Sequence, residues 1–383
     1  MWLLFIRFIL TNMNGTAILT LVIRLQKLAG PAIGGVPAGT PFSIFLVVIC
    51  VAKPFLSYNQ QIQLLKSKHL SIEDEVAAER ALHCYGYFSL VTGYKDLLKN
   101  PTTKNYQDGT TFQDLLAVYQ FDEELRELTL RHLLHIERHI RSALSYAFCN
   151  IYGDSQSAYS SIQNYDISTA KKNAEVTKLV NRYLLPLLNR PSNYPYIEHH
   201  KSKHSNVPLW VLINALTFGT VSKMYEYSNA QVQSAVSREF DFIREPQLRQ
   251  ILEVLTDFRN VCAHNERLFT HRCAKHDIPD LRLHQKLSIP KRGQEYIYGK
   301  RDYFSVVMAF RYLLPHAEFL TYKRNLANLT KISKNSPTSI GSEMNCVLLL
   351  RSFCGIISSK KKGVELQWLS KIILIRCPPS TTI

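Results

Sequence analysis

The chain has 383 residues, of which 46% are hydrophobic and 20% charged, and this is enough material for one or two well-packed domains. With only 15 Gly and 16 Pro, the composition excludes a collagen-like chain and extensive disorder. The formal net charge of +16 favours a polyanionic partner, either nucleic acid or an anionic membrane surface, although a solvated basic face is the simpler alternative.

Residues 1–52 differ from the rest of the chain. They hold three apolar runs, none of which reaches the roughly 18–20 apolar residues of a membrane span. No basic segment precedes the first run, which argues against a signal peptide. The segment is either a weak membrane-associating extension or a stretch outside the functional domain. We favour the second interpretation, because orderly helical patterning starts at residue 53, and we do not expect membrane association.

From residue 53 to about 330 the apolar residues recur with a helical period, and no run is typical of a sustained sheet. Ser57 and the pair Thr111 and Asp114 are suitable N-terminal caps, and Ser71 with Asp74 resembles a capping motif. The predicted helices cover 57–69, 71–94, 121–149, 169–189, 208–228, 246–264 and 303–329, with loops over 99–111, 190–208 and 270–300. The fold class is therefore all-α, followed by a basic, poorly patterned tail over 331–383.

The eight cysteines are scattered without a C-x-x-C pair, which argues against a zinc ribbon and against a dense disulfide framework. We expect reduced thiols in a cytoplasmic protein. The sequence has no phosphate-binding glycine motif and no G-x-S-x-G, and we expect neither a metal ion nor another cofactor.

Several histidines and tyrosines are weaker candidates for a functional site. His132, His135 and His139 share one helical stripe, but in HIERH the glutamate stands at the third position, so the metalloprotease motif is absent. A basic or partner-facing stripe is the simpler interpretation. The segment HHKSKH, 199–204, is interpreted as a solvated loop. The aromatic-rich segment 83–94 can stack on bases, but Tyr85, Tyr87 and Tyr94 are better explained as packing residues.

The segment 248–267 forms a two-faced helix when about 100° is allowed per residue. One stripe is apolar: Leu248, Ile251, Leu255, Phe258 and Cys262. The other stripe is polar: Glu253, Asp257, Asn260, His264 and Arg267. Arg259 lies on the boundary between the two stripes.

This set of residue types suits RNA cleavage without a metal. Histidine titrates near neutral pH and moves protons, and arginine binds phosphate through two hydrogen bonds and stabilises charge that develops on it. A carboxylate one turn away can orient an imidazole. For an arbitrary pair of this spacing, however, a solvated helix face is the simpler explanation.

The segment RNVCAH, 259–264, has the R-N-x-x-x-H form of HEPN ribonuclease domains, and AHNERLF resembles the end of the diagnostic helix of the Abi-like (AbiD/AbiF) abortive-infection family. Four other stretches resemble that family in order, and the resemblance covers about 53–330. They are KPFLSYNQQIQLL, LHCYGYFSLVTGY, the long segment from FQDLLAVYQF to RSALSYAF, and VPLWVLINALTFGTVSKMY. Residues 1–52 and the tail have no counterpart in the family.

The resemblance implies a HEPN-like multi-helix bundle with helical insertions and no substantial sheet. It also implies a toxin-like role in phage defence, with RNA as substrate and with an antitoxin, either RNA or protein. HEPN sites are composite, and a single R-N-x-x-x-H motif per chain therefore implies a homodimer. By resemblance His264 transfers protons, Arg259 binds the phosphate and the transition state, and Asn260 positions the substrate. The supporting residues are Arg267, Asp257, Glu137 and Arg141.

Two hypotheses follow from these observations. In the first, the chain is a metal-independent endoribonuclease that cleaves RNA by attack of the 2′-hydroxyl. In the second, it is a non-catalytic HEPN module that binds RNA or a partner and acts as a sensor or a regulated scaffold. The intact R-N-x-x-x-H motif favours the enzyme.

Overall fold

The computed structural model describes residues 54–332. The expectations for residues 1–52 and for the tail beyond residue 332 lie outside these described residues. The chain divides into two units between Gln60 and Gln61, inside the first described helix, and every helix and strand after that one lies in the second unit.

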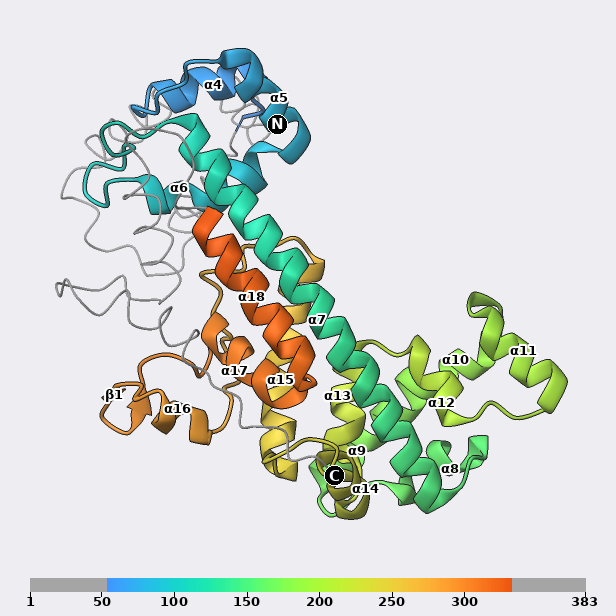
Figure 1. Ribbon diagram of the computed structural model, residues 1–383. Helices are drawn as coiled ribbons and strands as arrows, with labels where there is room; N and C mark the ends of the chain where they lie inside the picture. The colour runs from blue at the N-terminus through green and yellow to red at the C-terminus, as the bar shows by residue number, and fades with distance from the viewer. Residues whose placement is uncertain (1–53, 333–383) are drawn as a thin grey trace, which may run out of the picture. The chain divides into compact units, whose positions relative to one another are not determined.

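The described residues are mainly helical, which confirms the all-α class (Figure 1). The π-helical segments are η1 (Phe88–Thr92) and η3 (Leu179–Leu184), and a small antiparallel pair is formed by β1 (Lys291–Arg292) and β2 (Glu295–Tyr296). The α-helices are α4 (Tyr58–Lys66), α5 (Glu75–Tyr85), α6 (Gly93–Leu98), α7 (Phe112–Tyr152), α8 (Gln156–Ser160), α9 (Ala170–Lys178), α10 (Leu185–Asn189), α11 (Pro195–His204), α12 (Leu209–Leu212), α13 (Phe218–Tyr227), α14 (Ala230–Ser237), α15 (Glu245–Ala263), α16 (Arg282–Lys286), α17 (Tyr303–Leu313) and α18 (His316–Ile332).

Helix α7 is the element on which the others pack. Its N-terminus is capped reciprocally: Asp114 N donates to Thr111 Oγ1 over 3.1 Å, and Thr111 N donates to Asp114 Oδ2 over 2.9 Å. The predicted helical restart at Thr111 and the strong helix over 121–149 are thus one helix of 41 residues. Helices α14, α15 and α18 contact it, and Figure 1 shows α18 alongside it. Because its buried side chains recur every three or four residues, one face of α7 supplies much of the core.

The predicted helix over 71–94 is wrong in two details. Its N-cap is Asp74, whose carboxylate accepts from Ala77 N at 2.9 Å, because Ser71 is occupied in backbone hydrogen bonds with Thr110 and Phe112. Helix α5 then ends at Gly86, whose φ of 74° lies in a region that only glycine adopts without strain. The chain continues through η1 into α6.

The predicted loop over 190–208 is also wrong, because it contains α11. Pro195 stands in the first turn, where the missing N–H costs nothing, and basic side chains end the helix. Only Ile197 of this helix is buried, so the apolar period that would have revealed a helix is missing from the sequence.

Other differences come from breaks inside predicted helices. The stretch 208–228 is interrupted at Leu216, after which Thr217 caps α13, and the stretch 303–329 is interrupted before Pro315, between α17 and α18. Helices α8, α14 and α16 were not predicted. Within residues 54–332 no helix combines the length and the apolar character needed to cross a bilayer.

Candidate active site

Helix α15 carries the R-N-x-x-x-H motif on its last turns. The predicted apolar stripe is confirmed, because Leu248, Ile251, Leu255, Phe258 and Cys262 are all buried. Further residues of α15 are buried as well, so the helix is enclosed by α7, α13, α14 and α17 on more than one side. The apolar stripe therefore fixes the rotation of the helix, and with it the direction of the polar residues.

The helix ends in a Schellman motif. Asn265 has φ 56°, its N–H donates to the Cys262 carbonyl over 3.3 Å, and the N–H of Glu266 donates to the Val261 carbonyl over 3.0 Å. His264 is the C-terminal cap residue rather than a residue of the helix interior. The cap places its imidazole at an exposed corner where the chain reverses direction.

Arg259 lies against a buried carboxylate of α7. Its Nε is 3.5 Å from Glu137 Oε2, and the Glu137 side chain is 2% exposed while that of Arg259 is 29% exposed. Glu137 also forms an ion pair with Arg141, and Arg141 Nη2 donates to the Leu216 carbonyl over 2.6 Å. The structure therefore brings together Arg259, Glu137 and Arg141, which are candidate residues from two helices far apart in sequence.

The contact of Arg259 with Glu137 is an ion pair and not a hydrogen bond. Glu137 Oε2 and Arg259 Nε are both buried atoms without a hydrogen-bond partner in the described part of the chain. Since a guanidinium group carries five N–H donors, Arg259 keeps donors for an additional anion. The carboxylate orients the arginine without saturating it.

Asn260 and His264 are exposed and lie one turn apart, at i and i+4, on the same face of α15. Within residues 54–332 neither side chain has a hydrogen-bond or ion-pair partner. These two side chains are therefore available to a ligand.

The remaining polar residues are placed differently from what the helical stripe predicted. Asp257 Oδ2 is 2.7 Å from His271 Nε2, and His271 also packs edge-on against Phe258, with ring centroids 5.0 Å apart. The imidazole contacted by Asp257 is therefore that of a histidine 14 residues further on, which the sequence reading missed. No local pattern marks such a pair.

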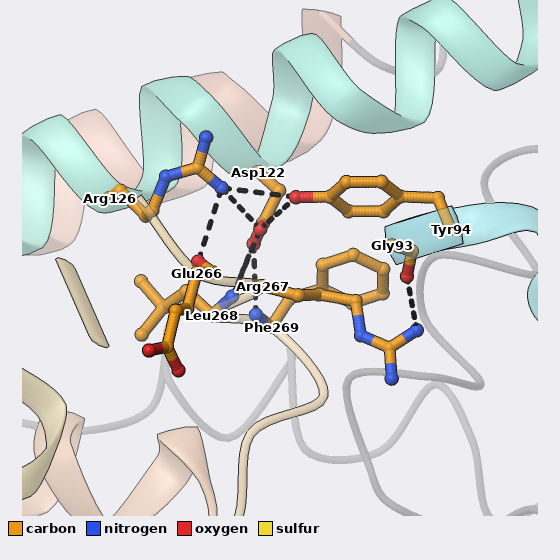
Figure 2. A network of polar contacts seen from close by, with 8 residues as sticks. All are labelled: Gly93, Tyr94, Asp122, Arg126, Glu266, Arg267, Leu268 and Phe269. Atoms are coloured by element: carbon orange, nitrogen blue, oxygen red, sulfur yellow. Dashed lines mark hydrogen bonds and ion pairs between the residues drawn. The ribbon is translucent and has the colours of Figure 1, made fainter. Parts of the chain in front are cut away.

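Arg267 does not continue the polar stripe, and that prediction is wrong because α15 ends at Ala263. Its Nη1 donates to the carbonyl of Gly93 over 2.6 Å. The half-buried side chain of Arg267 thus ties the loop after His264 to the start of α6 (Figure 2).

A buried polar network holds the same loop (Figure 2). The fully buried carboxylate of Asp122 accepts from Tyr94 Oη and Arg126 Nη1, both over 2.6 Å. It also accepts from the backbone N–H groups of Leu268 and Phe269, each over 2.9 Å. These hydrogen bonds hold Leu268 and Phe269, which follow His264 closely in the chain, against α7. This network was not predicted from the sequence. The i, i+4 spacing of Asp122 and Arg126 was a weak indication that these two residues form an ion pair.

Burial raises the pKa of Asp122, while the charge of Arg126 and the N–H donors oppose that shift. Burial also raises the pKa of Tyr94, and the neighbouring Asp122 adds to the effect, so the phenol stays a donor. The network is thus a set of donors that converge on one carboxylate.

The histidine stripe of α7, which was expected to be a basic or partner-facing surface, is packed against other elements of the same chain. His132 is buried against Tyr322, burial lowers its pKa, and its Nδ1 is 2.8 Å from the Leu128 carbonyl. His135 pairs with Glu318, and His139 packs on Phe240 with ring centroids 4.8 Å apart. Across residues 54–332 no three His, Cys, Asp or Glu side chains are grouped as metal ligands would be.

The three tyrosines of 83–94 pack as predicted, whereas Phe88 is exposed. Tyr94 is buried, and Tyr85 and Tyr87 lie partly buried against the core. The histidines of 199–204 lie on the exposed helix α11, with ring centroids of His200 and His204 5.3 Å apart.

The four cysteines in the part of the chain that the structure describes are free thiols. Burial raises the pKa of Cys262 to about 12, so this thiol, inside the motif, is a packing residue and not a nucleophile.

The family model described as Abi-like protein matches residues 80–270, a segment that contains every candidate site residue. It is shorter than the resemblance expected over 53–330. Neither the curated proteins nor the solved structures contain a significant match. The match over residues 80–270, from within α5 to just beyond the loop after α15, supports membership of the Abi-like protein family.

Proposed function

We propose that this protein is a phage-defence endoribonuclease that cleaves RNA without a metal ion at a composite site formed by two copies of the chain. The observation that carries the proposal is the end of α15, where Arg259 is oriented by buried Glu137 while Asn260 and His264 remain exposed and unpaired within residues 54–332. The family match agrees with a defence role, because abortive infection is the activity after which the family is named.

The chemistry requires one base and one acid. A base removes the proton of the 2′-hydroxyl, the 2′-oxygen attacks phosphorus, and the bond from phosphorus to the 5′-oxygen breaks. An acid then gives a proton to the departing 5′-oxygen. The products are a 2′,3′-cyclic phosphate and a 5′-hydroxyl, so atoms and charge balance without an added reactant.

Named side chains account for one half of this reaction. His264 holds or delivers the proton, and Arg259 binds the non-bridging phosphate oxygens and stabilises the charge that grows on them. Asn260 donates or accepts a hydrogen bond at the ribose or phosphate, one turn from His264. In-line displacement places base and acid on opposite sides of phosphorus, so a second His264 from another copy completes the site.

Glu137 is the carboxylate that orients Arg259 in this proposal. A buried carboxylate next to two arginines holds Arg259 in place before substrate arrives, and so lowers the entropy that binding must remove. Arg141 contributes by neutralising the same carboxylate and by fixing the Leu216 carbonyl on the neighbouring element.

The test is incubation of purified protein with RNA in EDTA, followed by chemical mapping of the ends. Wild type should release 2′,3′-cyclic phosphate and 5′-hydroxyl ends, and His264→Ala and Arg259→Ala should each lower the rate by about 100-fold or more, the range for loss of an acid–base group. Glu266→Ala, an exposed neighbour, is the matched control and should retain wild-type rates. Cleavage that persists in both site variants refutes the assignment, and RNA binding without cleavage indicates the non-catalytic module instead.

The composite site has its own test. When His264→Ala protein is mixed with wild type and allowed to exchange subunits, activity should fall with the square of the wild-type fraction, because a mixed dimer has only one histidine. A linear fall would show that each chain acts alone.

A further inference from the structure

A cavity of about 300 Å³ lies between the helical segment of α9 and η3 and one side of α13. Its walls include two tyrosines, two lysines and two threonines: Tyr183, Tyr227, Lys178, Lys223, Thr217 and Thr220. The volume stands at the lower end of the range of about 300–1,000 Å³ that is typical of small-ligand pockets. It suits one nucleotide unit and is too small for a duplex.

The side chains that line the cavity are aromatic and polar, and each of its two lysines lies close to a carboxylate. Tyr183 is 41% exposed, so its ring can offer a face for stacking. Lys223 Nζ donates to Glu226 over 2.6 Å and lies 5.8 Å from the centre of the Tyr227 ring, and Lys178 is 3.6 Å from Glu175. Because neighbouring carboxylates balance both ammonium groups, the cavity fits the polar, uncharged edge of a nucleobase better than a bare phosphate.

One wall of the cavity lies close to α15, the helix that carries the candidate active site. Gly219, which also lines it, approaches α15 so closely that a Cβ there would lie 3.3 Å from Thr256 Cγ2. Thr256, Asn260 and His264 follow one another at i, i+4 and i+8, on one face of α15. The eight steps from Thr256 to His264 span about 12 Å along the helix axis, at roughly 1.5 Å per residue.

The residue that precedes the cavity wall contacts Arg141 of the arginine cluster. Leu216, whose carbonyl binds Arg141, immediately precedes Thr217 of the cavity wall. The cavity is thus linked to the exposed motif through Thr256 and to the pair of Glu137 and Arg141 through Leu216.

We propose that this cavity receives the base of a nucleotide close to the scissile phosphate and so restricts the enzyme to unpaired RNA with a base preference. The inference rests on the proposed function, because it assigns a subsite to the same RNA strand. A base can enter only when it is unstacked and unpaired, as in a loop or a single strand. Tyr183 then stacks on the base, and Lys178, Thr217 and Thr220 contact its polar edge.

The experiment measures binding separately from cleavage. His264→Ala protein is titrated into short fluorescent single strands of oligo-U, oligo-C and oligo-A and into an RNA duplex, and the dissociation constants are compared. Tyr183→Ala and Lys178→Ala are added to this parent. Arg182→Ala and Lys171→Ala are the matched controls, because both residues are exposed and do not line the cavity. Arg182 precedes Tyr183 in sequence, and Lys171 lies on the same helix as Lys178.

The parent should prefer one single-stranded homopolymer and bind the duplex weakly. Tyr183→Ala should weaken the preferred strand about tenfold, which is the scale of one lost base–aromatic stack, and should reduce the difference between homopolymers. The controls should keep that preference. Pocket variants that bind every strand as their parent does overturn the inference.

Cleavage separates this inference from the proposed function. If wild type cleaves RNA but the base preference next to the cut is unchanged in Tyr183→Ala, the subsite is refuted and the nuclease stands. If no RNA is cleaved but the pocket variants lose base preference in binding, the nuclease fails and the base-binding cavity stands.

Discussion

Replacement of Asp122 by asparagine removes one charge from the centre of the network shown in Figure 2, with little change in shape. All four partners of Asp122 are donors: the Tyr94 hydroxyl, the Arg126 guanidinium and the N–H groups of Leu268 and Phe269. An amide side chain has only one acceptor oxygen, and its NH₂ group would face donors. At least one buried donor therefore loses its partner, and Arg126 keeps a buried charge without a counter-ion.

The size of the expected loss in the free energy of unfolding follows from how deeply the two charged side chains are buried. The Arg126 and Asp122 side chains are 4% and 0% exposed, so solvent cannot replace the lost partner. Removal of one member of a buried ion pair costs about 3–5 kcal/mol, and a single unsatisfied buried donor costs about 1–3 kcal/mol. The two costs overlap because they describe the same contacts. We therefore expect Asp122→Asn to lower the free energy of unfolding by about 3–5 kcal/mol.

Chemical denaturation of wild type and of Asp122→Asn, fitted with one m-value for both proteins, measures this loss of stability. Glu124→Gln is the matched control, since it makes the same substitution type on an exposed position of α7 and should change stability by less than about 0.5 kcal/mol. A loss below about 1 kcal/mol in Asp122→Asn would refute the account of the network. Because the network holds the loop after His264, RNA cleavage should also fall in this variant under conditions where it remains folded.

Three further predictions concern separate parts of the fold. Glu137→Gln should lower kcat/KM for RNA about tenfold, because Arg259 loses the carboxylate that orients it, and unchanged kinetics would contradict that role. Thr111→Ala should destabilise the protein by about 1 kcal/mol in denaturant by removing the cap of α7, and no change would contradict the capping assignment. Burial lowers the pKa of His132, so the unfolded chain takes up a proton that the folded chain excludes. Stability should therefore fall as pH drops below about 6.5, the unfolded value, until the lowered folded pKa is passed, and His132→Gln should reduce that slope in denaturation series across pH.

The predictions that were confirmed concern contacts between residues close together in the sequence. Capping of α7 by Thr111 and Asp114 and the apolar stripe of α15 are properties of neighbouring residues, and helical periodicity reveals them. Helix α11 was missed because it buries only Ile197 and so has no apolar period. Arg267 was misplaced because the periodicity cannot show where a helix stops, although Asn265 is a residue type common at the left-handed end of helices.

The sequence by itself determined the all-α class, the two faces of α15 and the positions of Arg259, Asn260 and His264 on its end. These features depend on the rotation of about 100° per residue along a helix and on the chemistry of each side chain. Both are properties of neighbouring residues. Only the tertiary structure placed Glu137 against Arg259, and only it tied Asp122 to Leu268, 146 positions away. Such contacts arise because the buried face of each helix must find another helix to pack on, and the polar groups enclosed between them must then be paired.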